Sequence, residues 1–337
     1  MRKLWWISGI LLVSCLDSKE TKLQRFLIQS NDMVRKQNTE EAERFLREAL
    51  KLDSCFADAW NNLGTLYFDQ MNYGEALEYY DHAVRCKPDF TDGYFNRANT
   101  AYELKEYYRA LMDLETVIQD KPDTATVYFL QGLIYTRLRD FDKAQHSFLD
   151  AQSLDPDNNE ILVNLGTVYY YKKQFDSARY FLQRAIDSNP KEANAFNALA
   201  MLEVELENYD QANKLLSTAL AIHPKDPYFL NNRGYIFLLT HQLDKALADI
   251  DLSIALDPYN GWAYRNKGIY YLMQEEYDDA IRLLKRAESG DPFIEKIYFF
   301  LGEAYYNHNE KTLACEYYTK ARERKEMSNE SYNTKCK

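Results

Sequence analysis

The residues that could support catalysis or metal binding are five histidines and five cysteines. These are His82, His146, His223, His241 and His308, and Cys15, Cys55, Cys86, Cys315 and Cys336. Histidine can act as a general base, or bind zinc with cysteine, only when its partners lie within reach. The sequence has no CxxC pair and no HExxH, Walker or GxGxxG motif. We therefore expect no metal and no cofactor.

Pairs of carboxylates recur along the chain, for example Asp249 with Asp251 and Glu275 with Glu276. Two carboxylates can divide acid and base roles when their environments separate their pKa values. On helices, however, such charges usually form a face exposed to solvent. We expect solvated faces, no catalytic residues and a protein that is not an enzyme. An enzyme with an unrecognised site is the alternative.

Composition limits the class of partner. The chain has 337 residues and a formal net charge of −11, with no basic stripe. Nucleic-acid binding needs clustered lysine and arginine to displace counterions, so we expect no nucleic acid. We attribute the acidity to solubility, and a basic partner is the alternative.

A pattern with a period of 34 residues positions all these side chains. In residues 57–90 two apolar stripes with helical spacing flank a turn around Asn72, and Pro88 ends the second stripe. One column holds only alanine: Ala42, Ala76, Ala110, Ala144, Ala178, Ala212, Ala246, Ala280 and Ala314. The column of Gly64 holds only glycine, alanine or serine. A helix–turn–helix hairpin therefore repeats between residues 23 and 328.

These residues resemble the tetratricopeptide repeat, whose pattern is W-x2-L-G-x2-Y, then A-x3-F, then P, on a period of 34. Residues 57–90 match it nearly in full, with Tyr80 in the place of phenylalanine. The resemblance implies an all-α fold, a right-handed superhelical solenoid of antiparallel helix pairs. The nine expected repeats are 23–56, 57–90, 91–124, 125–158, 159–192, 193–226, 227–260, 261–294 and 295–328. The first and last depart most, with Ser54 and Glu326 where proline is expected.

A repeat array separates the candidate catalytic residues in space. The five histidines fall in five different copies and at five different places in the repeat. Residues several repeats apart cannot meet in a solenoid unless they share a column. Cys55 and Cys86 fall near the ends of consecutive second helices, on one rim. We expect free thiols there, with a disulfide as the alternative in an oxidising compartment. Cys336 is expected to be the more exposed thiol, in a mobile tail.

The family resemblance also implies a binding surface. First helices line the inner groove of such a solenoid, and places 2, 5, 9 and 12 of each repeat face it. The late copies are the best candidates, because tyrosine, tryptophan and arginine are enriched in interface hot spots. The expected partner-binding residues are Tyr228, Asn231, Tyr235, Trp262, Arg265, Ile269, Phe299 and Tyr306. Packing of Trp262 and Tyr228 within the groove wall is the alternative, and the family's full carboxylate clamp is absent.

Both ends of the chain carry interpretable segments. Residues 1–14 have the layout of a signal peptide, with Arg2 and Lys3 before a short apolar run. The end of that run resembles a bacterial lipobox, which implies a lipidated Cys15, a linker over 15–22 and a cell-envelope location as an outer-membrane lipoprotein. An incidental apolar N-terminus is the alternative. Residues 329–337 are expected to be a polar tail, so that the last second helix caps the array itself.

Two function classes follow. The first is a lipid-anchored envelope scaffold that binds a partner protein or peptide in its concave groove. The second is a soluble cytoplasmic adaptor or co-chaperone. An accessory protein of an envelope polysaccharide or secretion machine is a further alternative within the first class. The identity of the partner and the oligomeric state are beyond the sequence.

Overall fold

The computed structural model describes residues 18–336, and these form helices with no strand among them. The expected all-α fold of paired helices is confirmed. The chain divides into two compact units, Met1–Leu154 and Asp155–Lys337. The signal peptide expected at 1–14 and the lipidated Cys15 lie outside the described residues. No helix among residues 18–336 has the length and apolar character needed to cross a membrane.

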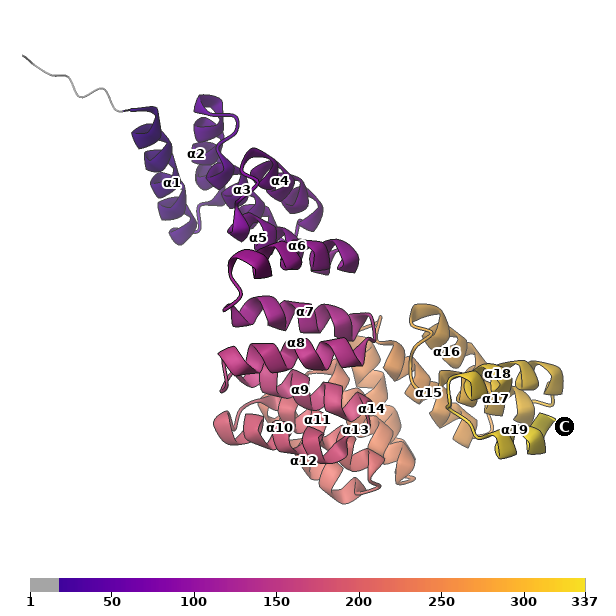
Figure 1. The fold of residues 1–337 in the computed structure, drawn as a ribbon. Helices are drawn as coiled ribbons and strands as arrows, with labels where there is room; N and C mark the ends of the chain where they lie inside the picture. The colour runs from indigo at the N-terminus through magenta and orange to yellow at the C-terminus, as the bar shows by residue number, and fades with distance from the viewer. Residues whose placement is uncertain (1–17, 337) are drawn as a thin grey trace, which may run out of the picture. The chain divides into compact units, whose positions relative to one another are not determined.

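Each unit consists of consecutive antiparallel helix pairs (Figure 1). The first unit contains α1 (Lys19–Arg35), α2 (Thr39–Leu52), α3 (Ala57–Asp69), α4 (Tyr73–Cys86), α5 (Thr91–Glu103), α6 (Tyr107–Asp120), α7 (Ala125–Arg137) and α8 (Phe141–Leu154). The second contains α9 (Asn159–Tyr171), α10 (Phe175–Ser188), α11 (Ala193–Glu205), α12 (Tyr209–Ile222), α13 (Pro227–Leu239), α14 (Leu243–Leu256), α15 (Gly261–Met273), α16 (Tyr277–Gly290), α17 (Ile297–Asn307), α18 (Lys311–Glu323) and α19 (Asn329–Cys336). From α2 to α18, the second helix of each pair begins 34 residues after the second helix of the preceding pair.

Small residues allow the two helices of a pair to approach closely. All nine members of the alanine column are fully buried. In the glycine column, a Cβ built on Gly132 would lie 2.6 Å from the ring of Phe148, and one on Gly166 would lie 2.5 Å from Leu182. The large side chain of the second helix therefore occupies the space that a side chain on the first helix would need.

The turn inside each pair has the same backbone in every repeat. A non-glycine residue with φ between 54° and 66° follows each first helix: Gln37, Met71, Lys105, Arg139, Lys173, Glu207, His241, Glu275 and Asn309. The next amide donates a hydrogen bond back into the helix, as Asn72 N does to the Tyr67 carbonyl at 2.9 Å. This left-handed residue ends the first helix and reverses the chain.

The expectation of free thiols at Cys55 and Cys86 is wrong. The two residues form a disulfide, with their Cα atoms 5.2 Å apart. Cys86 ends α4, and Cys55 lies in the turn between α2 and α3. Packing of these consecutive elements brings the two Cβ atoms within bonding reach, which sequence spacing alone does not show.

The C-terminal residues are a helix rather than the expected uncapped tail. Residue Glu326 replaces the proline that ends other repeats, and its amide donates to the Ala321 carbonyl at 2.8 Å. Lys325 adopts the left-handed conformation used in the inner turns. The chain therefore reverses after α18, and Ser328 accepts a hydrogen bond from the Ser331 amide at the start of α19.

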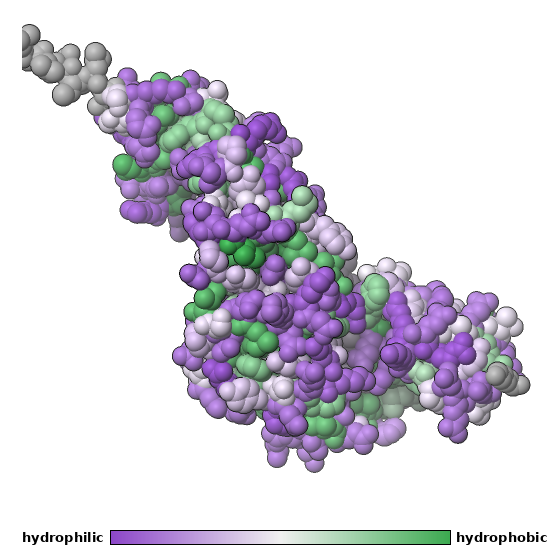
Figure 2. Space-filling model, in the orientation of Figure 1, coloured by the Kyte–Doolittle hydropathy of each residue, from purple (hydrophilic) through white to green (hydrophobic). Residues whose placement is uncertain are grey.

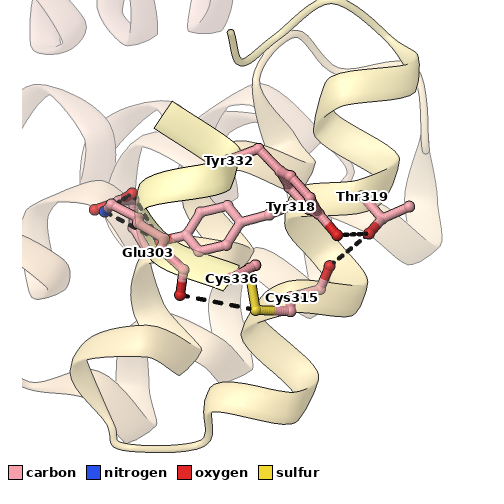
Figure 3. The surroundings of a disulfide bond; sticks show 7 residues. Glu303, Cys315, Tyr318, Thr319, Tyr332 and Cys336 are labelled. Atoms are coloured by element: carbon pink, nitrogen blue, oxygen red, sulfur yellow. Dashed lines mark hydrogen bonds and ion pairs between the residues drawn. A yellow bond between two sulfur atoms is a disulfide. The ribbon is translucent and has the colours of Figure 1, made fainter. Parts of the chain in front are cut away.

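Helix α19 is attached to α18 by a second disulfide (Figure 3). Cys336 bonds to Cys315, so the expectation of a free, exposed Cys336 is also wrong. The Thr319 hydroxyl donates a 3.3 Å hydrogen bond to the Tyr332 hydroxyl, and Lys335 pairs with Glu303. Tyr332 and Cys336 pack on the core of the last pairs. The array is thus capped by α19 and not by α18 alone.

Candidate partner-binding site

The carboxylate pair Asp249 and Asp251 serves structure. The guanidinium of Arg233 donates to both oxygens of Asp249, at 2.6 and 2.8 Å, and Asp249 is only 8% exposed. Asp251 pairs with Lys267 at 2.7 Å. Both carboxylates therefore have a cationic partner. Asp251 is exposed as expected, whereas the expected solvated position is wrong for Asp249, which is buried in its ion pair with Arg233.

The histidines are distributed over separate local contacts. His82 stacks on Trp60 with ring centroids 4.5 Å apart, and His308 lies 2.8 Å from Glu310 and 3.3 Å from Asp278. Within residues 18–336, no group of three or more histidine, cysteine or acidic side chains could hold a metal ion.

A cavity of about 590 Å³ lies in the second unit. First helices build it, namely α9, α11, α13 and α15, together with the segment that precedes α17. Side chains lining the cavity include Glu160, Val163, Asn164, Thr167, Tyr170, Glu192, Asn194, Asn197, Met201, Glu205, Asp226, Tyr228, Asn231, Asn232, Tyr235, Trp262, Arg265, Glu295 and Lys296. The wall of the cavity combines polar and aromatic side chains. The face of the molecule shown in Figure 2 is mostly hydrophilic, with small separate hydrophobic patches.

The structure brings five of the eight expected partner-binding residues to this cavity. Tyr228, Asn231, Tyr235, Trp262 and Arg265 line it. The other three do not: Ile269 is buried, and Phe299 and Tyr306 pack on the core of the last helix pairs.

Arg265 is buried in the cavity wall instead of extending from it. Its side chain is 5% exposed, and Nε and Nη2 donate to Asn266 Oδ1 at 3.0 and 2.7 Å. Nη1 donates to the Glu295 carbonyl at 3.0 Å. The guanidinium also lies 4.8 Å from the ring centroids of both Tyr235 and Trp262. Burial lowers the pKa of Arg265. Arg265 therefore holds two aromatic rings and the segment before α17 in place.

Tyr228 is the most exposed aromatic side chain of the cavity wall, followed by Tyr171 at 43%, and Trp262 is less exposed than either. Tyr228 is 52% exposed, and its hydroxyl donates to Asp257 at 3.3 Å. Trp262 is half-buried, since it packs on the core of the last helix pairs as well as lining the cavity. Trp262 can therefore pack within the cavity wall and still contact a bound partner.

Asparagines connect the first helices, and of these the sequence analysis selected only Asn231, not Asn197, Asn232 or Asn266. Asn232 Nδ2 donates to Asn197 Oδ1 at 2.8 Å, and Asn266 Nδ2 donates to Asn231 Oδ1 at 2.7 Å. The recurrence of asparagine at a spacing of one repeat plus one residue is the signal that could have identified them. Side-chain amides offer both donors and acceptors, as a polypeptide backbone requires.

The cavity is acidic. Burial raises the pKa of the Tyr170 hydroxyl, and the charges of Glu205 and Glu295 raise it further. Those two carboxylates come from α11 and from the segment before α17, so side chains remote in sequence act on one hydroxyl. The wall carries five carboxylates and two basic side chains, so its net charge is negative.

Comparisons with known proteins agree with this architecture. A family model described as the cytochrome c-type biogenesis protein H TPR domain matches residues 88–228. Two models described as tetratricopeptide repeat match residues 57–90, and residues 197–261 and 265–327. No curated protein sequence matches the chain significantly.

Solved structures share the fold. The chain is similar to one in the APC/C hetero-tetramer Cut9–Hcn1, with a TM-score of 0.60 and 17% identity over 89% of this chain and 59% of that chain. It thus spans 59% of that protein's length. It is also similar to PilF of Pseudomonas aeruginosa, with a TM-score of 0.54 and 21% identity over 61% of this chain and 94% of that chain. At these identities the likeness shows the fold alone.

Proposed function

We propose that this chain, which belongs to the tetratricopeptide repeat family, is a scaffold for a partner protein or peptide and is not itself catalytic. Such families are generally non-catalytic interaction modules. The observation that carries the proposal is the cavity of about 590 Å³ on the first helices of the second unit. Its size lies within the usual range for binding sites, and its aromatic and amide side chains suit a polypeptide.

The proposed location is the bacterial cell envelope, at the outer membrane, through a lipid on Cys15. The signal-like residues 1–14 and the lipobox-like sequence support this location. The disulfides Cys55–Cys86 and Cys315–Cys336 also support it, because disulfides persist in oxidising compartments and are rare in the cytosol. They count against the soluble cytoplasmic adaptor.

Metabolic labelling with a palmitate analogue tests the anchor. Wild-type protein should take up the label and fractionate with membranes. The Cys15→Ala variant should do neither, because the acyl acceptor is removed. Label retained by Cys15→Ala would exclude lipidation at this residue.

A crosslinking pull-down from membranes tests the binding site. The double variant Tyr228→Ala with Trp262→Ala removes two aromatic side chains from the cavity wall and keeps the buried Arg265. The matched control is Tyr108→Ala with Tyr259→Ala, which removes two exposed tyrosines elsewhere. We expect the cavity variant alone to lose its crosslinked proteins. An unchanged set of proteins would refute the site.

A further inference from the structure

Four glutamates on the cavity wall form no salt bridge with a described lysine or arginine, although the charge of Glu295 attracts the buried Arg265. Glu160, Glu192, Glu205 and Glu295 line the cavity, and none forms an ion pair within residues 18–336. The fifth carboxylate, Asp226, has a structural role, because it accepts hydrogen bonds from the Tyr228 and Phe229 amides at 2.9 Å each. Surface carboxylates elsewhere in the chain are often paired, as Glu41 is with Arg44.

The cations of the wall do not offset these charges. Only Arg265 and Lys296 are basic among the lining residues. The guanidinium of Arg265 is buried, and all three of its nitrogens donate to Asn266 or to the Glu295 carbonyl. With five carboxylates against two cations, the cavity has a net negative charge that a ligand can complement.

The aromatic side chains fit the same ligand chemistry. Tyr228, Tyr235 and Trp262 line the same cavity as the acidic side chains. Lysine and arginine carry a long apolar stem below the charged group, and this stem packs on aromatic rings while the charge reaches a carboxylate. The amides of Asn194 and Asn197 lie on the same wall and suit the backbone of an extended chain.

We infer that the occupant of this cavity is an extended polypeptide segment rich in lysine and arginine. The inference rests on the proposed function and specifies its partner. The basic side chains pair with Glu160, Glu205 and Glu295, and their stems contact Tyr228 and Trp262. Affinity for such a segment falls as salt rises, because these carboxylates are accessible to solvent.

Fluorescence polarisation with three defined peptides tests the inference on the full-length protein. The labelled probes alternate serine with lysine, with asparagine or with glutamate. The lysine peptide should bind most tightly, and the glutamate peptide should not bind. A lysine peptide that fails to bind, or that binds no better than the asparagine peptide, overturns the inference.

A pair of triple variants separates the cavity from the acidity of the whole chain. The cavity variant is Glu160→Gln, Glu205→Gln and Glu295→Gln. The control carries the same charge change at exposed, unpaired positions of the first unit: Glu40→Gln, Glu78→Gln and Glu115→Gln. The cavity variant should weaken lysine-peptide binding by about tenfold or more, and the control by less than about twofold. Equal losses would show that net charge alone attracts the peptide, which overturns the inference.

This inference can fail while the proposed function stands. If the variant Tyr228→Ala with Trp262→Ala loses its crosslinked proteins but the peptides show no basic preference, the cavity binds a partner of another chemistry. Tighter binding of a neutral oligosaccharide than of the lysine peptide would likewise overturn the basic-segment assignment.

Discussion

Replacing Gly132 by alanine should destabilise the pair α7–α8 through a steric clash. The new Cβ would lie 2.6 Å from two ring carbons of Phe148 and 2.8 Å from a third. Ordinary contact requires the ring to retreat by roughly 1 Å. Phe148 is fully buried, so the ring can move only by displacing its neighbours. Overpacking of this kind typically costs about 1–3 kcal/mol.

The clash can be separated from the intrinsic preference of alanine for helices. That preference stabilises a helix by up to about 1 kcal/mol relative to glycine. Gly74→Ala on α4 is the matched control, because nothing lies within 4 Å of the Cβ built there. The difference between the two variants in free energy of unfolding, measured by urea titration and circular dichroism, should be about 1–3 kcal/mol in favour of Gly74→Ala.

A second substitution should relieve the clash. The pairs Ala98 with Leu114 and Ala200 with Leu216 occupy the same two columns and are fully buried. Phe148→Leu should therefore cost less in the Gly132→Ala background than in the wild type, with a coupling of about 1 kcal/mol. Equal stability of Gly132→Ala and Gly74→Ala, or strict additivity in this double-mutant cycle, would refute the packing argument.

Three further predictions concern stability. Replacing both cysteines of the first disulfide, with Cys55→Ser and Cys86→Ser, should lower the free energy of unfolding by about 3–4 kcal/mol. This magnitude follows from the 31-residue separation of the two cysteines, because the bond restricts that length of the unfolded chain. Chemical denaturation under oxidising conditions measures the difference. Ala178→Leu should cost about 1–3 kcal/mol, because Ala178 is fully buried, and an unchanged thermal midpoint would contradict the register. Burial raises the pKa of Tyr80 to about 12 from 10.0. The folded state thus favours the neutral phenol. The stabilisation that this gives the folded state is complete below about pH 10 and is lost between about pH 10 and pH 12. Tyr80→Phe should therefore lose less free energy of unfolding than the wild type over that pH range, as urea titrations can measure.

The helices could be predicted from the sequence because local spacing determines them. Ala178 and its column are fully buried, and a column of small residues at constant spacing leaves few other packing solutions. The same local reasoning did not predict α19, because the repeat pattern stops at Glu326. A capping serine and the spacing of Tyr332 and Cys336 were the only local signals there.

The binding site could be predicted only in part. The faces of the first helices follow from the family pattern, which explains why Tyr228 and Trp262 line the cavity. The burial of Arg265 depends on a carbonyl 30 residues away and on a ring from the preceding repeat. The disulfide partners are likewise defined by packing between neighbouring elements. Such long-range contacts leave no periodic trace in the sequence.

The disulfide Cys55–Cys86 has a mechanical consequence. When a chain is pulled from its ends, the 31-residue stretch enclosed by this bond cannot lengthen, which removes about 100 Å of contour at about 3.3 Å per residue. Tension applied near the N-terminus therefore passes across a covalent bridge at α3 and α4 instead of peeling those helices apart. In a stretching experiment with optical tweezers, adding a reductant should restore that hidden length.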